Sequence, residues 1–321
     1  MKVFFGIDIG GTQIKFGVFS EKAKLLQKWS VKTDLSEAGN RIIPQVGKEV
    51  GNWLQKQGLT EKSVSGIGLG IPGPVDEKGY VRTCVNLNWH DFYPAIELEK
   101  EFPDAVIAAG NDANVAALGE YMQGAGKKYS SAMLITIGTG IGGGIILNGK
   151  IVSGAHGIAG EIGHITTDSE ATGTCNCGNT GCVDHIASAT GIVRRMKELL
   201  VQNKENHALR GKDFTAKDVC GKAAEGDALC IRCIEQCMEP LGKAMAFFSH
   251  AFDPQVFIIG GGVSRAGDII LEPLRKFYQK NLYLIQEGAD IRTAQLGNDA
   301  GMIGSCMMAM DKASETERQR I

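Results

Sequence analysis

No apolar stretch in the sequence is long enough to cross a lipid bilayer, and the first apolar run, KVFFGIDI, is too short for a secretory signal. An excess of either charge is also missing, since the formal net charge is −2. This balance argues against a nucleic-acid-binding surface, so we expect neither a membrane nor a nucleic acid among the partners. The pattern GxxxxGK(S/T) does not occur, which excludes a P-loop enzyme.

Cysteine is present, but not in the pattern of a secreted disulfide framework. The nine cysteines are an odd number, and three of them have the spacing of metal ligands. Free thiols of this kind are typical of a reducing compartment, so we expect a cytoplasmic protein. At 321 residues the chain is long enough to bury a substantial core and to form two domains.

The most specific pattern in the chain is GEIGHITTDSEATGTCNCGNTGCVD, residues 160–184. It places Glu161 three residues before His164, and a glycine-rich segment with three cysteines follows: Cys175, Cys177 and Cys182. One histidine and three thiolates are the ligands of a closed, tetrahedral structural zinc site. Taken separately, the Glu–His pair also fits a helix surface, and the cysteines fit buried small residues. Their order within one glycine-rich loop favours zinc.

The segments that begin at Phe4 and Met133 share one pattern: an apolar strand, a glycine-rich turn and a second strand. In the second segment, Asn148–Gly149 between apolar runs adds a strong hairpin signal. This duplication predicts an α/β protein with two similar halves around a central cleft. We place a smaller domain at residues 1–118 with 300–321, and a larger domain at residues 119–299.

Apolar periodicity predicts the remaining elements. Strands are predicted at residues 2–9, 13–19, 24–31, 105–109 and 255–259, and a further strand in SGIGLGIPGPVD, residues 65–76, runs into a Pro/Gly turn. Helices are predicted at residues 37–57, 95–101, 113–122, 188–202, 216–224, 227–252 and 299–313, with residues 315–321 as a solvated tail. A CxxC pattern within residues 230–237 falls at helical spacing, which favours buried thiols over a redox or metal motif. Leu241, Met245 and Phe248 form an apolar stripe that fits the core or a dimer contact.

Three glycine-rich turns each follow an apolar strand: DIGGT (8–12), GTGIGGG (138–144) and GGGVS (260–264). Backbone amides without side-chain bulk can surround phosphate oxygens, so three such turns favour a nucleotide site, although each alone fits an ordinary tight turn. The residues expected at the nucleotide are Gly10, Gly11, Thr12, Gly138, Thr139, Gly140, Gly260, Gly261 and Gly262. A strand follows the GxGxxG of the second turn, which argues against a dinucleotide-binding fold.

Charged and amide side chains accompany these turns. Asp8 and Lys15 flank the first turn, where a carboxylate is placed to orient a hydrated Mg²⁺; a turn cap is an equally good interpretation of Asp8. Asn111 and Asp112 stand where a strand gives way to a helix. Local spacing favours a helix N-cap there, and the expected cleft makes Asp112 as a general base a competing interpretation.

Together these motifs resemble the ROK family of bacterial sugar kinases and repressors. The motifs that carry the resemblance are DIGGT at 8–12, ND at 111–112, GTGIGGG at 138–144, GEIGH at 160–164, CNCGNTGC at 175–182 and GGGVS at 260–264. They cover essentially the whole chain in the order expected of the family. The resemblance implies the actin-like, ribonuclease-H-like ATPase fold, with two domains that close over a sugar and ATP, and it implies a homodimer.

The resemblance also implies a role for each motif. Asp112 is then the catalytic base, and Asn111, Glu161 and His164 hold sugar hydroxyls. ATP lies on the glycine turns with Mg²⁺, and zinc lies on His164 and the three cysteines. Within the family, the motifs look most like those of the glucokinases of Gram-positive bacteria, which implies phosphorylation of glucose.

One position departs from that pattern. The family usually has a glutamate two residues after the last zinc cysteine, in contact with the sugar, and this chain has Asp184. We keep Asp184 among the expected sugar contacts. Because its side chain is one methylene shorter, other hexoses stay open as substrates: N-acetylglucosamine, N-acetylmannosamine, allose or fructose. The phosphoryl donor, ATP or polyphosphate, is open as well.

A sugar-binding regulator without catalysis is the rival from another class. Repressors of the family are expected to carry a helix-turn-helix before the first strand, which here begins at Lys2. The presence of Asp112 also favours chemistry over sensing. We therefore expect an enzyme.

Overall fold

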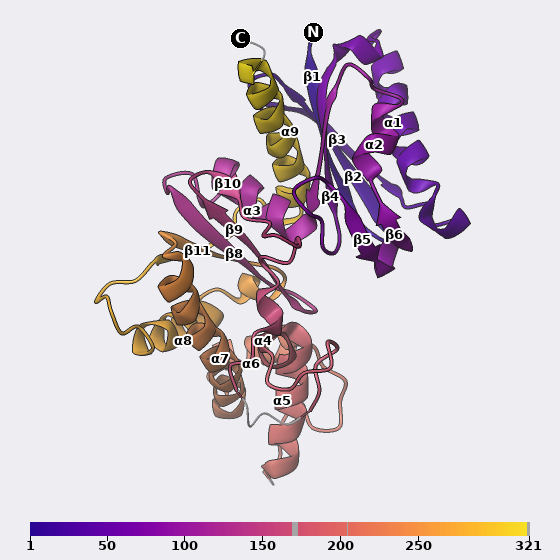
Figure 1. Ribbon diagram of the computed structural model, residues 1–321. Helices are drawn as coiled ribbons and strands as arrows, with labels where there is room; N and C mark the ends of the chain where they lie inside the picture. Colours follow the sequence, from indigo (N-terminus) through magenta and orange to yellow (C-terminus); the bar gives the residue numbers. More distant parts are fainter. Residues whose placement is uncertain (169–172, 204, 320–321) are drawn as a thin grey trace. The chain divides into compact units, whose positions relative to one another are not determined.

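The computed structural model of the protein describes residues 1–168, 173–203 and 205–319. The chain forms two compact units. The first comprises Met1–Lys127, Gly144–Gly160 and Leu296–Ile321, and the second comprises Lys128–Gly143 and Glu161–Gln295 (Figure 1). The division into a smaller domain at residues 1–118 with 300–321 and a larger one at 119–299 stays a prediction.

The first unit is built on a five-stranded sheet with the strand order β3-β2-β1-β4-β7. Its strands are β1 (Val3–Ile9), β2 (Gln13–Ser20), β3 (Leu25–Lys32), β4 (Val64–Ile71) and β7 (Val106–Asn111). The first three strands pair antiparallel as a meander, whereas β1, β4 and β7 run parallel. A separate hairpin consists of β5 (Val81–Cys84) and β6 (Trp89–Phe92). The parallel strands bring three carboxyl ends to one edge of the sheet.

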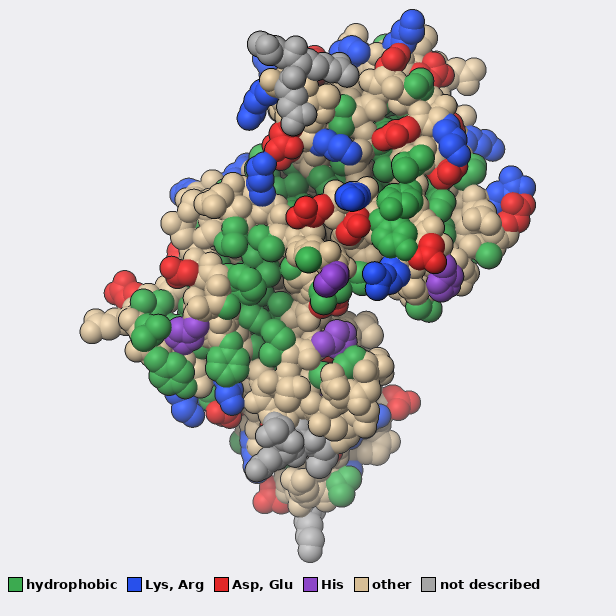
Figure 2. Space-filling model, in the orientation of Figure 1, with side chains coloured by type: hydrophobic (Ala, Val, Ile, Leu, Met, Phe, Trp, Pro, Cys, Tyr) green, Lys and Arg blue, Asp and Glu red, His purple; other side chains and the backbone are tan. Residues whose placement is uncertain are grey.

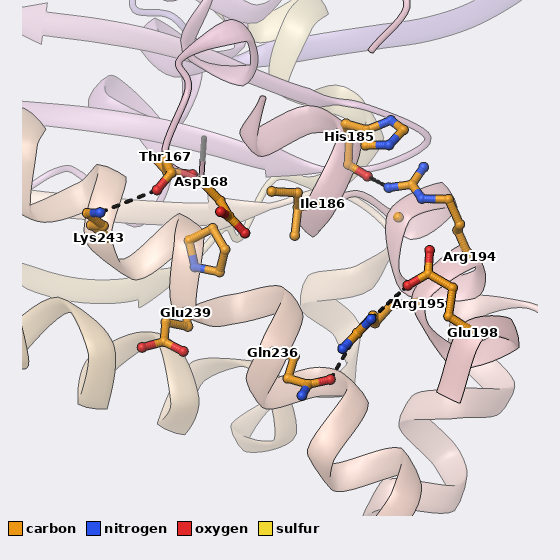
Figure 3. Close-up of a pocket in the computed structure, with 12 residues that line it drawn as sticks. Thr167, Asp168, His185, Ile186, Arg194, Arg195, Glu198, Gln236, Glu239 and Lys243 are labelled. Atoms are coloured by element: carbon orange, nitrogen blue, oxygen red, sulfur yellow. Dashed lines mark hydrogen bonds and ion pairs between the residues drawn. The ribbon is translucent and has the colours of Figure 1, made fainter. Parts of the chain in front are cut away.

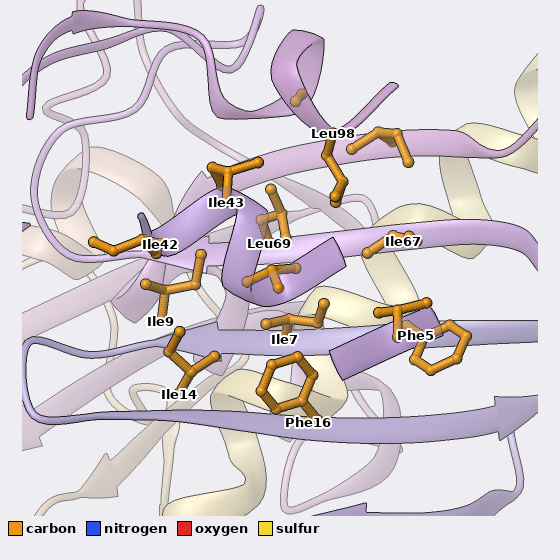
Figure 4. Close-up of a cluster of buried hydrophobic side chains, with 14 of the residues drawn as sticks. Phe5, Ile7, Ile9, Ile14, Phe16, Ile42, Ile43, Ile67, Leu69 and Leu98 are labelled. Carbon is orange, nitrogen blue, oxygen red and sulfur yellow. The ribbon is translucent and has the colours of Figure 1, made fainter. Parts of the chain in front are cut away.

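A hydrophobic core joins one face of this sheet to α1 (Ile42–Lys56) and α2 (Pro94–Glu99). Alternate residues of a strand point to the same face, and the apolar residues of the helices recur every three to four positions, so the two patterns meet in one layer. The side chains labelled in Figure 4 come from β1, β2, β4 and both helices: Phe5, Ile7, Ile9, Ile14, Phe16, Ile42, Ile43, Ile67, Leu69 and Leu98. Burial of each such side chain contributes roughly 1.5–3 kcal/mol.

The opposite face of the sheet is lined by glycines, and α9 (Ala300–Gln319) packs directly on it. A Cβ atom added at Gly68 would lie 1.7 Å from the carbonyl oxygen of Ser305, and one at Gly6 would lie 2.0 Å from that of Met302. Glycine alone allows the backbones of a helix and a strand to approach this closely. The close approach also brings the start of α9 against Asp8.

The second five-stranded sheet has the order β10-β9-β8-β11-β12. Its strands are β8 (Ser131–Ile137), β9 (Ile141–Leu147), β10 (Lys150–Ile151), β11 (Val256–Gly260) and β12 (Asp290–Thr293), and the boundary between the units falls within β9. The helices of the second unit are α4 (Val183–Ala187), α5 (Ala189–Gln202), α6 (Ala216–Ala224), α7 (Ala228–Phe252) and α8 (Asp268–Lys280). Helix α7 contacts the other four.

The two sheets have the same topology. Numbered in chain order within each sheet, the strands of both follow the order third, second, first, fourth, fifth. In each sheet a glycine-rich turn connects the first strand to the second. The predicted α/β fold and its internal duplication are therefore confirmed.

The apolar stripe of α7 belongs to the core of the second unit. Leu241 and Met245 are fully buried and Phe248 is 4% exposed within a single chain. The thiols of Cys230, Cys233 and Cys237 are buried on the same helix, as predicted. The core interpretation of the stripe is thus confirmed.

Several predicted element boundaries were wrong. The first helix begins at Ile42, not at residue 37, because Gly39 has a φ of +83° and turns the chain before the helix. The last helix continues to Gln319, beyond the predicted end at residue 313, and Glu315 on it forms a 2.6 Å ion pair with Lys150. Helices α4 and α8 and strands β5, β6 and β12 were not predicted.

On the face shown in Figure 2, basic and acidic side chains are interspersed, in agreement with the net charge near zero. Within the described part of the chain, no helix combines the length and the hydropathy that a membrane-spanning segment requires.

Candidate functional site

In the first unit, the predicted site residues gather at the carboxyl ends of three parallel strands. β1 ends before the turn Gly10–Thr12, β4 ends shortly before Gly73, and β7 ends at Asn111. Ligands of open α/β sheets bind at this edge. The turn is held by Thr33, whose hydroxyl donates to the carbonyl oxygen of Gly10 over 2.6 Å. The turn Gly10–Thr12 and the carboxylate of Asp112, which follows β7, therefore lie at the same edge of the sheet.

Asn111 is the last residue of β7, and Asp112 is the first residue of the helix that follows. The side chain of Asn111 is the N-cap of α3 (Asp112–Gln123), because its Oδ1 accepts a 3.0 Å hydrogen bond from the Asn114 amide. Its Nδ2 donates to the carbonyl oxygen of Gly73 over 2.9 Å. Asp112 is the first helical residue, where the positive end of the helix dipole favours its carboxylate. Asp112 lies at the same sheet edge, and its Oδ1 accepts a 2.8 Å hydrogen bond from the Ala113 amide.

Asp8 forms an ion pair with Lys15, its neighbour across the β1–β2 hairpin, with 2.9 Å between Oδ2 and Nζ. Lys15 also donates to the carbonyl oxygen of Asn298. Gly301 of α9 lies so close that an added Cβ would be 3.0 Å from the carboxyl carbon of Asp8. Among the described residues no backbone amide donates to this carboxylate, so the turn-cap interpretation has no hydrogen bond to support it.

One residue that sequence reasoning missed is Cys84, at the end of β5. Its side chain is 3% exposed, and burial, together with the nearby negative charge of Asp112, raises the pKa of its thiol. The sequence gives no spacing signal for this proximity, because the two residues belong to different motifs.

The other two glycine turns lie at one edge of the second sheet. β8 and β11 are parallel neighbours, and Gly260, which ends β11, pairs with Thr136, two residues before Gly138. Helix α5 fixes the first of these turns: the amide of Ala189 donates to the carbonyl oxygen of Gly138, and the Thr190 hydroxyl donates to that of Thr139. In the other turn, the Ser264 hydroxyl donates to the carbonyl oxygen of Gly261 over 2.9 Å. Both turns are therefore rigidly supported.

The four predicted metal ligands come together in the second unit. The donor atoms of His164, Cys175, Cys177 and Cys182 all lie within 4.8 Å of one another. Sγ of Cys175 is 3.7 Å from Nδ1 of His164, and the Sγ atoms of Cys177 and Cys182 are 3.6 Å apart. Tetrahedral zinc, with bonds of about 2.1 Å to nitrogen and 2.3 Å to sulfur, would separate such atoms by about 3.5–3.8 Å. The geometry therefore fits zinc.

Two thiols of this group have pKa values shifted in opposite directions. A hydrogen bond from the Asn179 amide is the main cause that lowers the pKa of Cys177. Burial, followed by the neighbouring thiols, raises the pKa of Cys182 to about 12. Three thiolates so close together repel one another, and a bound cation would remove that cost.

Two residues at the start of this loop are predicted sugar contacts, and both are exposed. Glu161 and His164 are exposed, at the start and end of a short 3-10 turn, Ile162–His164. Because Nδ1 of His164 faces the thiols, its Nε2 is the nitrogen left to donate a hydrogen bond to a ligand. Asp184, the third predicted sugar contact of this region, bonds to the protein backbone: its Oδ1 accepts a 2.5 Å hydrogen bond from the amide of Ile141, at the end of the glycine turn.

A second group with metal-ligand side chains consists of His207, Asp227 and Cys230. The amide of Leu209 donates to Nδ1 of His207, so the proton of the neutral imidazole lies on Nε2, which is 3.0 Å from Asp227 Oδ2. A protonated Nε2 cannot bind a metal. Asp227 in turn accepts hydrogen bonds from two amides at the start of α7. This group is a helix cap braced by a histidine.

A polar pocket of about 550 Å³ opens between α4, α5 and α7 (Figure 3). Its charged side chains are mostly engaged with the protein: Arg195 pairs with Glu198 over 2.7 Å, and Lys243 donates to the carbonyl oxygen of Thr167. Arg194 donates to the carbonyl oxygen of His185 and so ties α5 to α4. These bonds secure the helix that carries Asp184.

The fold and the site define a class: an actin-like α/β protein with duplicated sheets, glycine turns at the strand ends and a Cys3His group. The chain belongs to the ROK family, whose sequence profile matches residues 4–312. It is 39% identical to a glucokinase of Halalkalibacterium halodurans over 98% of each chain.

Solved structures support the same assignment. The ROK hexokinase of Thermus thermophilus is 30% identical, with a TM-score of 0.80 over 98% of this chain and 99% of that one. A ROK glucokinase of Streptomyces griseus, solved in complex with glucose and AMPPNP, is 32% identical, with a TM-score of 0.74 over 96% of this chain and 99% of that one. The predicted family and the actin-like fold are therefore confirmed.

Proposed function

We propose that the protein transfers the γ-phosphoryl group of ATP to the 6-hydroxyl of a hexose, with glucose as the preferred substrate. The observation that carries this proposal is the position of Asp112, at the sheet edge that also holds the turn Gly10–Thr12. The similarity to glucokinases over nearly the full chain supports the same activity.

In this mechanism Asp112 takes the proton of the sugar hydroxyl as its oxygen attacks the γ-phosphorus and ADP leaves. Asn111 caps α3 through Oδ1 and donates one Nδ2 hydrogen to the carbonyl oxygen of Gly73, so its second Nδ2 hydrogen is assigned to a sugar hydroxyl. The exposed side chains of Glu161 and His164 are the further sugar contacts that we assign.

The amides of the three glycine turns are assigned to the phosphates, where fixed N–H dipoles stabilise the charge that develops during transfer. Asp8 and Lys15 would hold the metal–nucleotide complex, in which Mg²⁺ neutralises phosphate charge. Zinc on His164 and the three cysteines would fix the loop that carries Glu161 and orient the imidazole through Nδ1. We assign no chemical step to zinc.

A coupled assay of ADP release tests the activity directly. The panel contains glucose, N-acetylglucosamine, N-acetylmannosamine, allose and fructose, each with ATP and Mg²⁺, and polyphosphate replaces ATP in a second series. We expect the highest kcat/KM with glucose and ATP. A protein that binds a sugar but turns over none of the panel would instead be a sugar-binding regulator.

Substitution of the proposed base gives a sharper test. Asp112→Asn keeps the size of the side chain but cannot accept the proton, so kcat should fall by about 10²–10⁴-fold while glucose binding persists. The matched control is Asp104→Asn, on the exposed turn before β7, which should leave kcat unchanged. Near-normal turnover by the Asp112 variant would show that this carboxylate is not the base.

A further inference from the structure

Three sequence motifs meet around one carboxylate in the second unit. Asp184 lies two residues after the zinc-group residue Cys182, which is the residue before α4. Its Oδ1 accepts the 2.5 Å hydrogen bond from the amide of Ile141, which directly follows the turn Gly138–Gly140. The two partners are 43 residues apart in the sequence. The carboxylate thus links the zinc loop to the glycine turn.

The packing around this hydrogen bond depends on two glycines, which have no side chain. A Cβ added at Gly140 would lie 2.5 Å from Oδ1 of Asp184. A Cβ added at Gly163 would lie 2.4 Å from the carbonyl oxygen of Ile141 and 3.2 Å from Cβ of Asp184. Gly163 belongs to the 3-10 turn that also holds His164. Both glycines therefore allow the turn, the carboxylate and the start of the zinc loop to lie in direct contact.

We propose that Asp184, through Oδ1, is a positioning residue for the nucleotide turn. This inference rests on the proposed function, because it assigns the turn Gly138–Gly140 to ATP phosphates. A carboxylate that accepts from a backbone amide fixes the orientation of that peptide, and a charge-assisted bond does so more firmly than a neutral one.

The length of the side chain supports this assignment. An aspartate has one methylene between backbone and carboxylate, and here that reach ends at the amide of Ile141. A glutamate would carry its carboxylate one methylene farther from the backbone, so the same hydrogen bond would require a different side-chain conformation. With an aspartate at this position, one carboxylate oxygen thus lies on the backbone of the turn.

The test compares Asp184→Ala with Asp184→Asn. The alanine variant loses the acceptor, and the KM for ATP should rise about tenfold, the change expected from loss of one hydrogen bond to a charged group, with the KM for glucose within twofold of wild type. The asparagine variant keeps an oxygen acceptor and should restore the KM for ATP to within about threefold of wild type. A larger rise in the KM for glucose than for ATP would overturn the inference, and so would an unchanged KM for both.

Calorimetric titration with AMPPNP and, separately, with glucose gives a readout independent of turnover. If wild type binds no AMPPNP, the proposed function fails; if wild type and Asp184→Ala bind it equally, only the inference fails. The zinc content of each variant should equal that of wild type, which shows that Cys182 is undisturbed. If Asp184→Ala does not fold, Asp184→Glu replaces it, because the extra methylene moves the carboxylate away from its position at the amide of Ile141; a KM for ATP equal to wild type would then overturn the inference.

Discussion

Addition of a single methyl group at Gly68 should separate α9 from the first sheet. The new Cβ would lie 1.7 Å from the carbonyl oxygen of Ser305, whereas contacts under 3.0 Å essentially never occur. The neighbour is helix backbone, which cannot rotate away as a side chain can, so α9 must shift by more than about 1 Å. We expect Gly68→Ala to lower the free energy of unfolding by about 3 kcal/mol, at the upper end of overpacking costs.

Gly51 offers the matched control. It lies within α1, and an added Cβ there would have no heavy atom within 4 Å. Alanine is preferred to glycine in a helix by about 1 kcal/mol, so Gly51→Ala should raise the free energy of unfolding by up to that amount. The same substitution is therefore expected to have opposite signs at the two positions.

Tryptophan fluorescence is a suitable probe, because all three tryptophans, Trp29, Trp53 and Trp89, lie in the first unit. Urea titrations of the two variants and wild type would follow the unfolding of that unit. A Gly68→Ala protein within about 0.5 kcal/mol of wild type would refute the argument that glycine is required for the contact with α9.

Two further predictions concern the second unit. Metal analysis should find about one zinc per chain in wild type, almost none in Cys177→Ser, and an unchanged amount in the control Cys220→Ser, a buried thiol of α6; a zinc-free wild type of normal stability and activity would refute the site. Burial alone would raise the pKa of Asp227, but hydrogen bonds from the Cys230 amide and His207 outweigh it, and the net pKa is lowered. Its stabilising effect is therefore present above the ordinary pKa of about 3.9 and is lost as the pH falls through the lowered value. Asp227→Asn keeps an acceptor for the helix cap but does not titrate. Its free energy of unfolding, measured by calorimetry, should therefore change less between pH 7 and about pH 3 than that of wild type, with a difference of less than about 1 kcal/mol. An equal pH dependence of the two proteins would contradict this.

The strand–turn–strand units were readable from the sequence because their signals are local. A buried strand before DIGGT or GTGIGGG needs only its own apolar residues and glycines, and both hairpins formed as predicted. The Cys3His group was readable for the same reason, because three of its four ligands lie within eight residues.

Elements with mixed signals were missed. In α8, the residues Ile270, Leu271, Leu274, Phe277 and Tyr278 are buried at helical spacing. Pro273 within the helix and Gly267 before it indicate a turn when they are read alone, and the helix forms because tertiary burial of this face outweighs them. The five-residue helix α4 is too short for periodicity to reveal it.

Long-range partners were beyond a reading of local spacing. The hydrogen bond between Asp184 and the amide of Ile141 joins two motifs whose sequences give no sign of contact. The proximity of Cys84 to Asp112 is of the same kind. Sequence patterns identified which residue types gather at a site, and the fold determined which of them touch.

The place of α9 in the chain has a consequence for synthesis on the ribosome. The helix packs against β1, β4 and α3, all of which are made before residue 124, yet it begins only at residue 300. The second unit ends at Gln295, so all of its residues leave the ribosome before α9 does. While the second unit is synthesised, α9 does not yet cover the glycine-lined face of the first sheet. The first unit, whose synthesis begins first, is therefore the last to obtain all of its elements.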